Sequence, residues 1–181
     1  MKILVVADMQ NDFITGELGS EDAKAIVPRV VDKIKSFDGE VFFTQDTHYK
    51  DGYSKTREGK HLPVEHCIHG KTGWKICDEI TPLIPSIVTG DHLVEKNTFG
   101  SMRLPQVIQY IDHNEGIEEI ELVGLCTDIC VISNAMILNA AFPNAQIVID
   151  ASCCAGVTKE SHNNALNAMK SVHIKVVNEE V

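Results

Sequence analysis

Short apolar runs recur along this chain, and stretches with helical periodicity lie between them. The first run, at 3–7, is continuously apolar, which is typical of a strand covered on both faces of its sheet. Strands that alternate with helices favour a mainly parallel sheet with helices on both faces. We therefore expect an α/β fold in which ligands bind at the carboxyl ends of the strands.

Cap, turn and breaker residues bound the expected elements. Strands are expected at 3–7, 40–44, 92–96, 119–123, 145–150 and 173–177, with a shorter extended piece at 86–90. Helices are expected from the cap residue Ser20 through 34, from Asp128 to 140, at 104–113 and at 161–171. Gly124 is expected to end its strand, and 9–19 and 49–74 are expected to be irregular. The second of these loops is long enough to form a lid over a site.

Length and composition suit a single globular domain over 1–181, because 181 residues with 44% hydrophobic content can form a substantial core. The net charge of −10 argues against partners such as nucleic acid or an anionic membrane, which are bound through Lys and Arg. The apolar start is too short for a signal peptide and no apolar run reaches membrane length, so we expect a cytoplasmic protein. Its six cysteines are then expected to be free thiols.

Charged or reactive residues stand where the expected strands end. Asp8 follows the first strand, Asp46 follows the second, and Lys96 closes the third. Cys130 follows the fourth strand after a turn. The carboxyl ends of parallel strands meet at one edge, so an acid, a base and a thiol can there surround one small molecule. The alternative for Asp8 and Lys96 is a purely structural ion pair.

Cys130 lies at the start of the helix that follows the fourth strand. The helix dipole and unpaired backbone N–H groups at such a position lower the pKa of a thiol and favour a nucleophilic thiolate. Cys126 lies four residues earlier, in the turn itself. The alternative is that both cysteines are small core residues, since free cysteine is among the most buried residue types.

A second group of residues has the chemistry of a metal site. Asp46 and His48 are two residues apart, so both face one side of an extended backbone, and His66 can approach from the lid loop. This mixed nitrogen and oxygen set suits zinc, iron or manganese. Ser54 and Glu58 are candidates for a further ligand, direct or through water. The same loop also contributes His61 and His69, which are either ligands or lid residues.

These motifs together resemble the isochorismatase-like cysteine hydrolases, and most closely the nicotinamidase/pyrazinamidase branch. The resemblance extends over nearly the whole chain and rests on one ordered set of segments. These are V-V-A-D-M-Q-N-D-F with Asp8, T-Q-D-T-H with Asp46 and His48, L-P-x-x-H-C with His66, V-E-K-N-T-F with Lys96, and G-L-C-T-D-I-C-V with Cys130.

The resemblance implies a role for each matched residue. Cys130 would be the nucleophile, Asp8 the proton-transfer carboxylate and Lys96 the residue that orients the pair. A cis peptide bond is implied between Leu125 and Cys126, with an oxyanion hole formed by the backbone N–H groups of Cys126 and Cys130. The implied fold is a three-layer α/β fold, and the implied cofactor is one divalent ion, held by the metal-site residues named above, with zinc favoured.

The sequence also departs from the family pattern. Ser54 stands where some nicotinamidases have a histidine, and Leu62-Pro63 stands near the position of an aromatic residue that often packs on the substrate ring. Phe13 and Phe99 remain as candidates for that packing, whereas Trp74 is interpreted as part of the lid. The remaining cysteines match no catalytic position and are expected to be structural: Cys67, Cys77, Cys153 and Cys154.

Hydrolysis of a small carboxamide, with nicotinamide favoured, is the function that the resemblance implies. One alternative is an amidohydrolase of the same fold that acts on an N-carbamoyl, ureido or other small amide. Another is a non-catalytic metal-binding or interaction protein, although such a protein does not need a thiol aligned with a proton carrier. The sequence leaves a homo-oligomer open.

Overall fold

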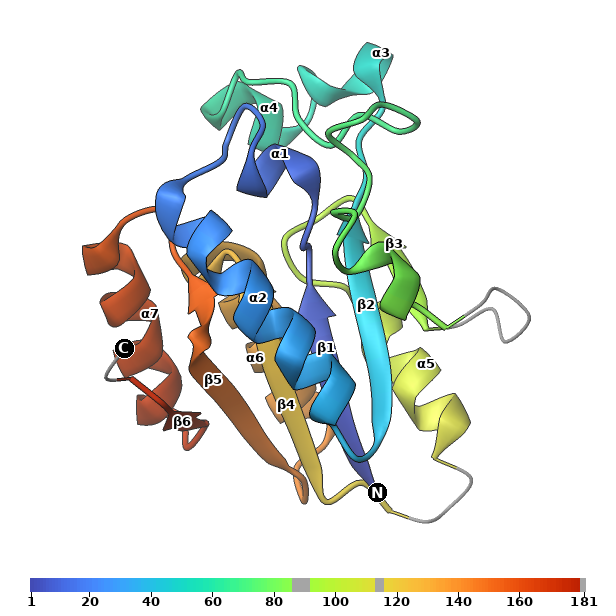
Figure 1. Cartoon of the computed structure of the whole chain (residues 1–181), viewed down its shortest axis with the longest axis vertical. Coiled ribbons are helices and arrows are strands. Elements are labelled where there is room, and N and C mark those ends of the chain that lie inside the picture. The colour runs from blue at the N-terminus through green and yellow to red at the C-terminus, as the bar shows by residue number, and fades with distance from the viewer. Residues whose placement is uncertain (86–91, 113–115, 180–181) are drawn as a thin grey trace.

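The strands form one parallel sheet, as the sequence predicts (Figure 1). The computed structural model describes residues 1–85, 92–112 and 116–179. Within these ranges the strand order is β3-β2-β1-β4-β5-β6, and every pairing is parallel. The strands are β1 (Lys2–Ala7), β2 (Glu40–Asp46), β3 (Leu93–Lys96), β4 (Glu119–Leu125), β5 (Gln146–Ala155) and β6 (Lys175–Val177).

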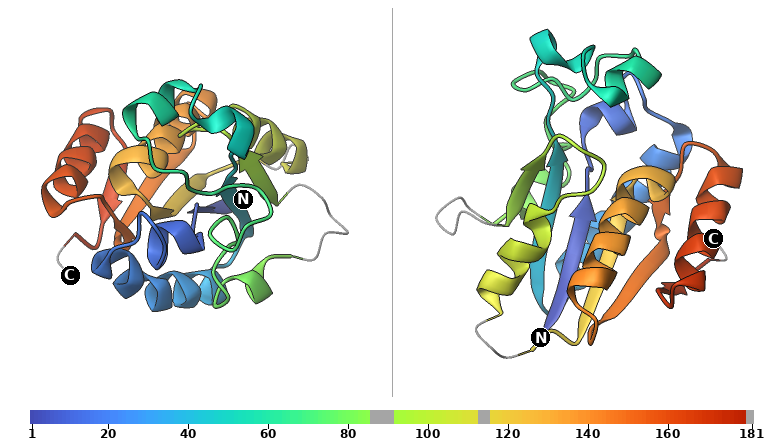
Figure 2. Two further views of the ribbon diagram at one scale, coloured as in Figure 1. Left: turned by 90° about the horizontal axis from the view of Figure 1, so that it is seen from above. Right: turned by 180° about the vertical axis from the view of Figure 1, so that it is seen from behind.

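Helices cover both faces of the sheet (Figures 1 and 2). On one face lies α2 (Glu21–Ser36), and on the other lie α5 (Arg103–Ile111), α6 (Ile132–Ala141) and α7 (Lys159–Ser171). The expected cap of α2 is confirmed, because the Ser20 hydroxyl accepts a hydrogen bond from the Ala23 N–H at 3.0 Å. In the described ranges no helix is both long and apolar enough to cross a bilayer.

The first strand shows why its sequence is continuously apolar. Ile3 and Val5 belong to the core beneath α5, α6 and α7, whereas Leu4 and Val6 belong to the core beneath α2. All four side chains are at most 1% exposed. Successive side chains of a strand point to opposite faces, so a central strand between two helical layers needs an apolar residue at each position.

Gly124 does not end its strand, which corrects the expectation from the sequence. β4 continues to Leu125, and Gly124 lies within it at φ +113°. A Cβ at this position would lie 2.2 Å from the carbonyl oxygen of Ala7 on the neighbouring β1. The pairing with β5 also shifts here. Glycine is therefore required for close approach of two strands and for an irregular register, rather than for chain termination.

The ends of other helices and strands differ from the expected positions by a few residues, and short helices occur where none was expected. Three helices lie within the stretches expected to be irregular: α1 (Asn11–Ile14), α3 (Lys50–Tyr53) and α4 (Arg57–His61). Two short turns are η1 (Thr81–Leu83) and η3 (Thr127–Val131), and β5 extends five residues beyond its expected end at 150. The expected extended piece at 86–90 and the expected helix end at His113 lie outside the described residues.

Candidate active site and metal centre

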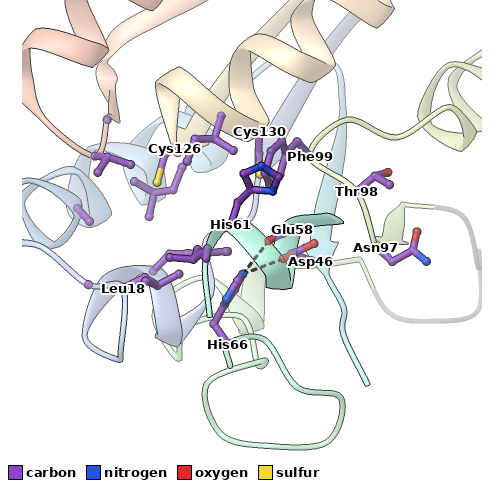
Figure 3. A pocket seen from close by; sticks show the side chains of 18 of the residues that line it. Leu18, Asp46, Glu58, His61, His66, Asn97, Thr98, Phe99, Cys126 and Cys130 are labelled. Atoms are coloured by element: carbon purple, nitrogen blue, oxygen red, sulfur yellow. Dashed lines mark ion pairs between the residues drawn. The ribbon is translucent and has the colours of Figure 1, made fainter. Parts of the chain in front are cut away.

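A pocket of about 770 Å³ lies at the carboxyl edge of the sheet (Figure 3). Its wall includes Asp46 from β2, Phe99 after β3, and Cys126 and Cys130 after β4. The segment around α4 also lines the pocket and contributes His61 among others. Strand ends far apart in the sequence therefore meet at one cavity, as a parallel sheet predicts.

Asp8, Lys96 and Cys130 form a buried cluster at this edge. The Lys96 Nζ lies 2.7 Å from Asp8 Oδ2, and it donates to the Cys130 Sγ at 3.5 Å. The Asp8 carboxylate also acts on the Cys130 thiol, because its negative charge raises the pKa of the thiol. The side chains of Asp8 and Lys96 are 0% and 1% exposed. The carboxylate, the ammonium and the thiol that the sequence places at separate strand ends are thus in mutual contact.

The backbone and a neighbouring hydroxyl hold Asp8 in place. Asp8 has φ +46°, a left-handed conformation that aspartate adopts more readily than most residues. Its N–H donates to the Thr44 carbonyl at 3.2 Å, and the Thr44 hydroxyl donates to Asp8 Oδ1 at 2.7 Å. Unusual backbone conformations of this kind cluster at functional sites. Thr44 was not among the residues expected from the sequence, since a threonine inside a strand carries no motif.

Burial dominates the acid–base properties of the cluster. It raises the pKa of the Cys130 thiol well above the usual 9.0, and the Lys96 ammonium opposes this rise only in part. The direction of this shift is opposite to the one expected at a helix start, because burial and the nearby carboxylates outweigh the charge of Lys96. Burial also raises the pKa of Asp8, against the opposing charge of Lys96. Such a thiol becomes a nucleophile by giving its proton to an adjacent base.

The turn that holds Cys130 is η3, which leads directly into α6. The cis peptide bond expected between Leu125 and Cys126 is confirmed. The N–H groups of Ile129 and Val131 both donate to the Cys126 carbonyl, at 3.0 and 3.1 Å. Asn134 fixes the turn from α6, because its side chain donates to the Cys130 carbonyl at 2.9 Å and accepts from the Ser101 N–H at 2.9 Å.

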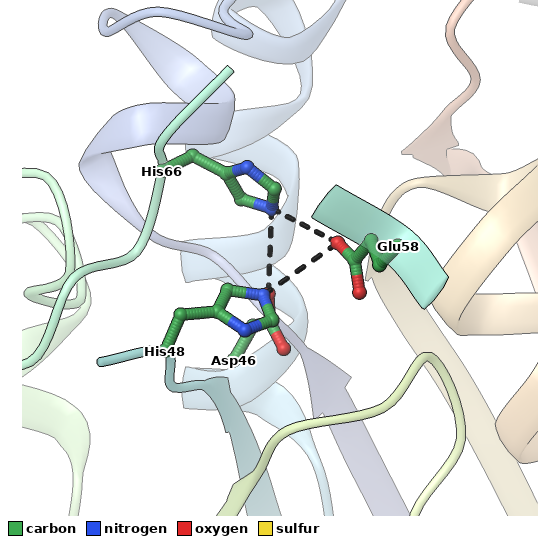
Figure 4. A group of neighbouring side chains, drawn as sticks. All are labelled: Asp46, His48, Glu58 and His66. Carbon is green, nitrogen blue, oxygen red and sulfur yellow. Dashed lines mark ion pairs between the residues drawn. The ribbon is translucent and has the colours of Figure 1, made fainter. Parts of the chain in front are cut away.

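Asp46, His48, Glu58 and His66 form a second cluster beside the thiol (Figure 4). Their potential ligand atoms all lie within 4.8 Å of one another. His48 Nε2 lies 2.9 Å from Asp46 Oδ2, and His66 Nε2 lies 3.2 Å from Glu58 Oε1. Of the two further ligands that the sequence leaves open, this geometry favours Glu58. Ser54 is exposed and caps the end of α3.

This cluster fits a divalent ion. His48 Nε2 is buried and has no hydrogen-bond partner among the described residues, although the Asp46 carboxylate is close, so the two groups are not aimed at one another. His66 Nδ1 donates to the Val64 carbonyl at 2.9 Å, which leaves Nε2 free of a proton in the neutral ring. Two imidazoles and two carboxylates are the donors that zinc, iron and manganese accept.

Charge and burial act in opposite directions on the four donors. Burial raises the pKa of Glu58, but the neighbouring imidazoles of His48 and His66 bring it to about 2. Burial lowers the pKa of His48, but Asp46 and Glu58 raise it to about 9. The carboxylates are therefore ionised at neutral pH, and an ion that binds the imidazoles must displace their protons.

Gln10 and Tyr53 support the donor cluster, and sequence reasoning missed both. The Gln10 side chain accepts from the Asp46 N–H at 2.7 Å and donates to the Asp46 carbonyl at 2.8 Å. Tyr53 donates to the Leu62 carbonyl at 2.7 Å and packs its ring against His48 and His66. The only sequence signal for Gln10 is its place two residues after Asp8, at the same strand end.

The remaining candidates divide between the pocket and its surroundings. Phe13, Phe99 and His61 line the pocket, and the ring centroid of Phe13 lies 5.6 Å from that of His66. His69 packs against Trp74, whose indole N–H donates to Thr47, so both lie in the loop after α4 rather than in the donor cluster. The other cysteines with no assigned role are buried: Cys67, Cys77, Cys153 and Cys154.

Known proteins resemble this chain over nearly its whole length. The nicotinamidase of Schizosaccharomyces pombe is 28% identical over 207 aligned residues, which cover 97% of this chain and 92% of the relative. The crystal structure of the nicotinamidase/pyrazinamidase of Bacillus subtilis has a TM-score of 0.79 and 28% identity, covering 98% of this chain and 99% of that one. The pyrazinamidase of Pyrococcus horikoshii in complex with zinc has a TM-score of 0.78, with 22% identity and 98% coverage of both chains.

The model of the isochorismatase domain matches residues 2–180, which includes every strand and every candidate site residue described above. The chain belongs to the isochorismatase family.

Proposed function

We propose that this protein hydrolyses nicotinamide to nicotinate and ammonia through a thioester on Cys130. The observation that carries the proposal is the contact of Asp8, Lys96 and Cys130 at the edge of a pocket that also holds four metal donors. The activities of the S. pombe and B. subtilis relatives support the same substrate.

The first half of the reaction forms the thioester. Asp8 takes the proton of the Cys130 thiol as the sulfur attacks the amide carbon, and the backbone N–H groups of Cys126 and Cys130 hold the oxyanion. When the C–N bond breaks, Asp8 returns that proton to the departing nitrogen, which leaves as ammonia. Lys96 holds the Asp8 carboxylate 2.7 Å from its ammonium, and so orients the base toward the thiol.

The second half releases the acid. Asp8 takes a proton from a water molecule as the water oxygen attacks the thioester carbon. The C–S bond then breaks, nicotinate forms, and the proton on Asp8 returns to the sulfur. No oxidant or further reactant is required, because one water is consumed and one ammonia is released.

Asp46, His48, Glu58 and His66 would hold one divalent ion, and zinc is the ion we propose. When bound, the ion supplies a Lewis-acid position for a ring nitrogen or a water molecule. The donor set supports this assignment, as does the zinc complex of the P. horikoshii pyrazinamidase. Phe13 and Phe99, which line the same pocket, would pack against the substrate ring.

Ammonia release from nicotinamide tests the proposal. The Cys130→Ala variant should lose at least about 10⁴-fold in kcat/KM, because removal of a nucleophile abolishes the covalent route. A matched control is Cys154→Ala, which removes another buried thiol that does not line the pocket and should keep the activity. A near-native rate in Cys130→Ala would show that the nucleophile is misassigned.

A panel of small amides tests the substrate. Nicotinamide, pyrazinamide and an N-carbamoyl amino acid should be compared on one preparation whose metal content is measured. We expect the two ring amides to be the better substrates. If nicotinamide is the poorest of the set, the protein is an amidohydrolase for a different amide.

A further inference from the structure

The pocket is larger than its proposed substrate. Cavities of about 300 to 1,000 Å³ enclose most of the surface of drug-sized ligands, and this pocket measures about 770 Å³. A single ring with one carboxamide occupies only part of such a volume. The rest of the pocket can therefore hold an additional group of a larger substrate.

The unused part lies away from the metal donors. In Figure 3, Leu18 and Cys126 lie on the side of the pocket opposite Asn97 and Thr98, and His66, Asp46 and Glu58 lie between. Leu18 and Cys126 pack against one buried apolar cluster, to which Ala23 belongs. We define the apolar arm as the part of the pocket lined by Leu18, Ala23, Cys126, Ile129 and Val157.

Four segments build the apolar arm: the loop before α2, the first turn of α2, η3, and the loop between β5 and α7. Three polar groups in these segments are paired within the protein. The Ser20 hydroxyl caps α2, the Val157 N–H donates to Asp128 at 3.1 Å, and Thr127 hydrogen-bonds His162 at 2.7 Å. Groups already paired in this way do not select a polar ligand, so apolar surface is what the arm offers.

One apolar side chain of the arm is largely exposed to solvent. Val157 is 61% exposed and lines the pocket. Ala23, from α2, contributes only a small side chain to the lining. A hollow with such a lining gains free energy when an apolar group enters it, roughly in proportion to the area removed from water.

We infer that the substrates of this protein include pyridine carboxamides that carry an apolar ring substituent, which the apolar arm binds. The inference rests on the proposed amide hydrolysis, because it uses the same thiol. It adds a substrate class that nicotinamide alone does not represent. The substituent enters the arm while the carboxamide lies at Cys130.

The test compares kcat/KM for nicotinamide with that for nicotinamides bearing a phenyl group at either of the two ring carbons farthest from the carboxamide. At least one phenyl isomer should reach or exceed the kcat/KM of nicotinamide. The ratio of kcat/KM for that phenyl isomer to kcat/KM for nicotinamide should then fall at least tenfold in Val157→Trp and in Ala23→Met, because the larger side chains narrow the apolar arm. A control, Val172→Trp, changes a residue that does not line the pocket and should leave the ratio unchanged.

The outcomes separate the two proposals. If nicotinamide is hydrolysed but both phenyl isomers are more than 100-fold poorer, or if the narrowing variants leave the ratio unchanged, the inference is overturned while the proposed function stands. If neither kind of amide is hydrolysed, the proposed function fails. The binding of nicotinamide and of the phenyl isomers to Cys130→Ser, measured by calorimetry, then tests the role of the apolar arm. Tighter binding of a phenyl isomer than of nicotinamide supports that role, and equal or weaker binding overturns it.

Discussion

The buried contact between Asp8 and Lys96 allows a quantitative test of the site by a double-mutant cycle. The variants are Lys96→Met, Asp8→Asn and their combination. The two charged atoms are 2.7 Å apart, and the side chains are at most 1% exposed. Lys96 also lies 3.4 Å from Asp46 Oδ1. Loss of the ammonium therefore leaves two buried carboxylates without their shared cation, whereas loss of the Asp8 charge leaves Lys96 with Asp46.

This asymmetry sets the expected magnitudes. Removing one partner of a buried ion pair costs about 3 to 5 kcal/mol of unfolding free energy. We expect about 4 kcal/mol for Lys96→Met, and about 2 kcal/mol for Asp8→Asn because one partner remains. The double variant should lose only about 3 kcal/mol, since no unpaired charge stays behind at the Asp8 position. The cycle then gives a coupling of about 3 kcal/mol.

Urea unfolding at neutral pH measures all four free energies. The exposed pair of Lys2 and Glu119 is the control, because it lies on the same sheet at 3.7 Å with side chains 54% and 29% exposed. The same cycle there should give less than about 1 kcal/mol. Additive losses at Asp8 and Lys96, or a smaller loss for Lys96→Met than for Asp8→Asn, would refute the picture of one cation shared by two carboxylates.

Two further outcomes follow from the other charged clusters. His48→Ala should lose bound metal and raise KM for nicotinamide strongly, while its melting temperature stays within about 5 °C of the wild-type value, since the site serves the ligand more than the fold. His69→Ala, outside the donor cluster, is the control. Loss of metal with a normal KM would contradict the assignment of these residues to a substrate-binding metal site. Lys33→Met should lose about 2 to 3 kcal/mol in urea unfolding, because Lys33 lies 2.8 Å from buried Asp150, while the exposed Lys35→Met should lose little. Lys33 lowers the pKa of Asp150, although burial opposes this shift. The stabilisation by the ion pair is therefore present above pH 3.8, the ordinary pKa of aspartate, and is lost as the pH falls through the lower pKa of the folded state. If the free energy lost in Lys33→Met stays constant down to pH 2, the ion pair is not the cause of that loss.

The sheet and the group of polar residues at its carboxyl edge could be predicted, because each is indicated by a short stretch of sequence. A continuously apolar run such as 3–7 predicts a doubly covered strand, and the polar residue after it marks the strand end. Lys96 and Asp46 could be placed at one edge for the same reason, since parallel strands share the direction of their ends. The residues at the carboxyl edge could therefore be predicted even though the order of the strands in the sheet was not known.

The rest depends on contacts that a sequence does not display. Gly124 breaks a pattern in the same way whether it ends a strand or approaches Ala7 of a neighbouring strand, and only the paired strand tells the two apart. The helices α3 and α4 are four and five residues long, too short for a period to show. The pKa of Cys130 depends on how completely the chain buries the thiol, and the helix start by itself predicted the opposite direction.

Asp46 joins the two halves of the site. Its Oδ1 lies 3.4 Å from the Lys96 ammonium, and its Oδ2 lies 2.9 Å from His48 Nε2. Gln10 holds the Asp46 backbone by both its N–H and its carbonyl, and Gln10 follows Asp8 by two residues at the end of β1. The thiol cluster and the donor cluster are therefore built on neighbouring strand ends that are tied to one another. A substrate that must reach both clusters therefore meets a spacing that is fixed by the sheet.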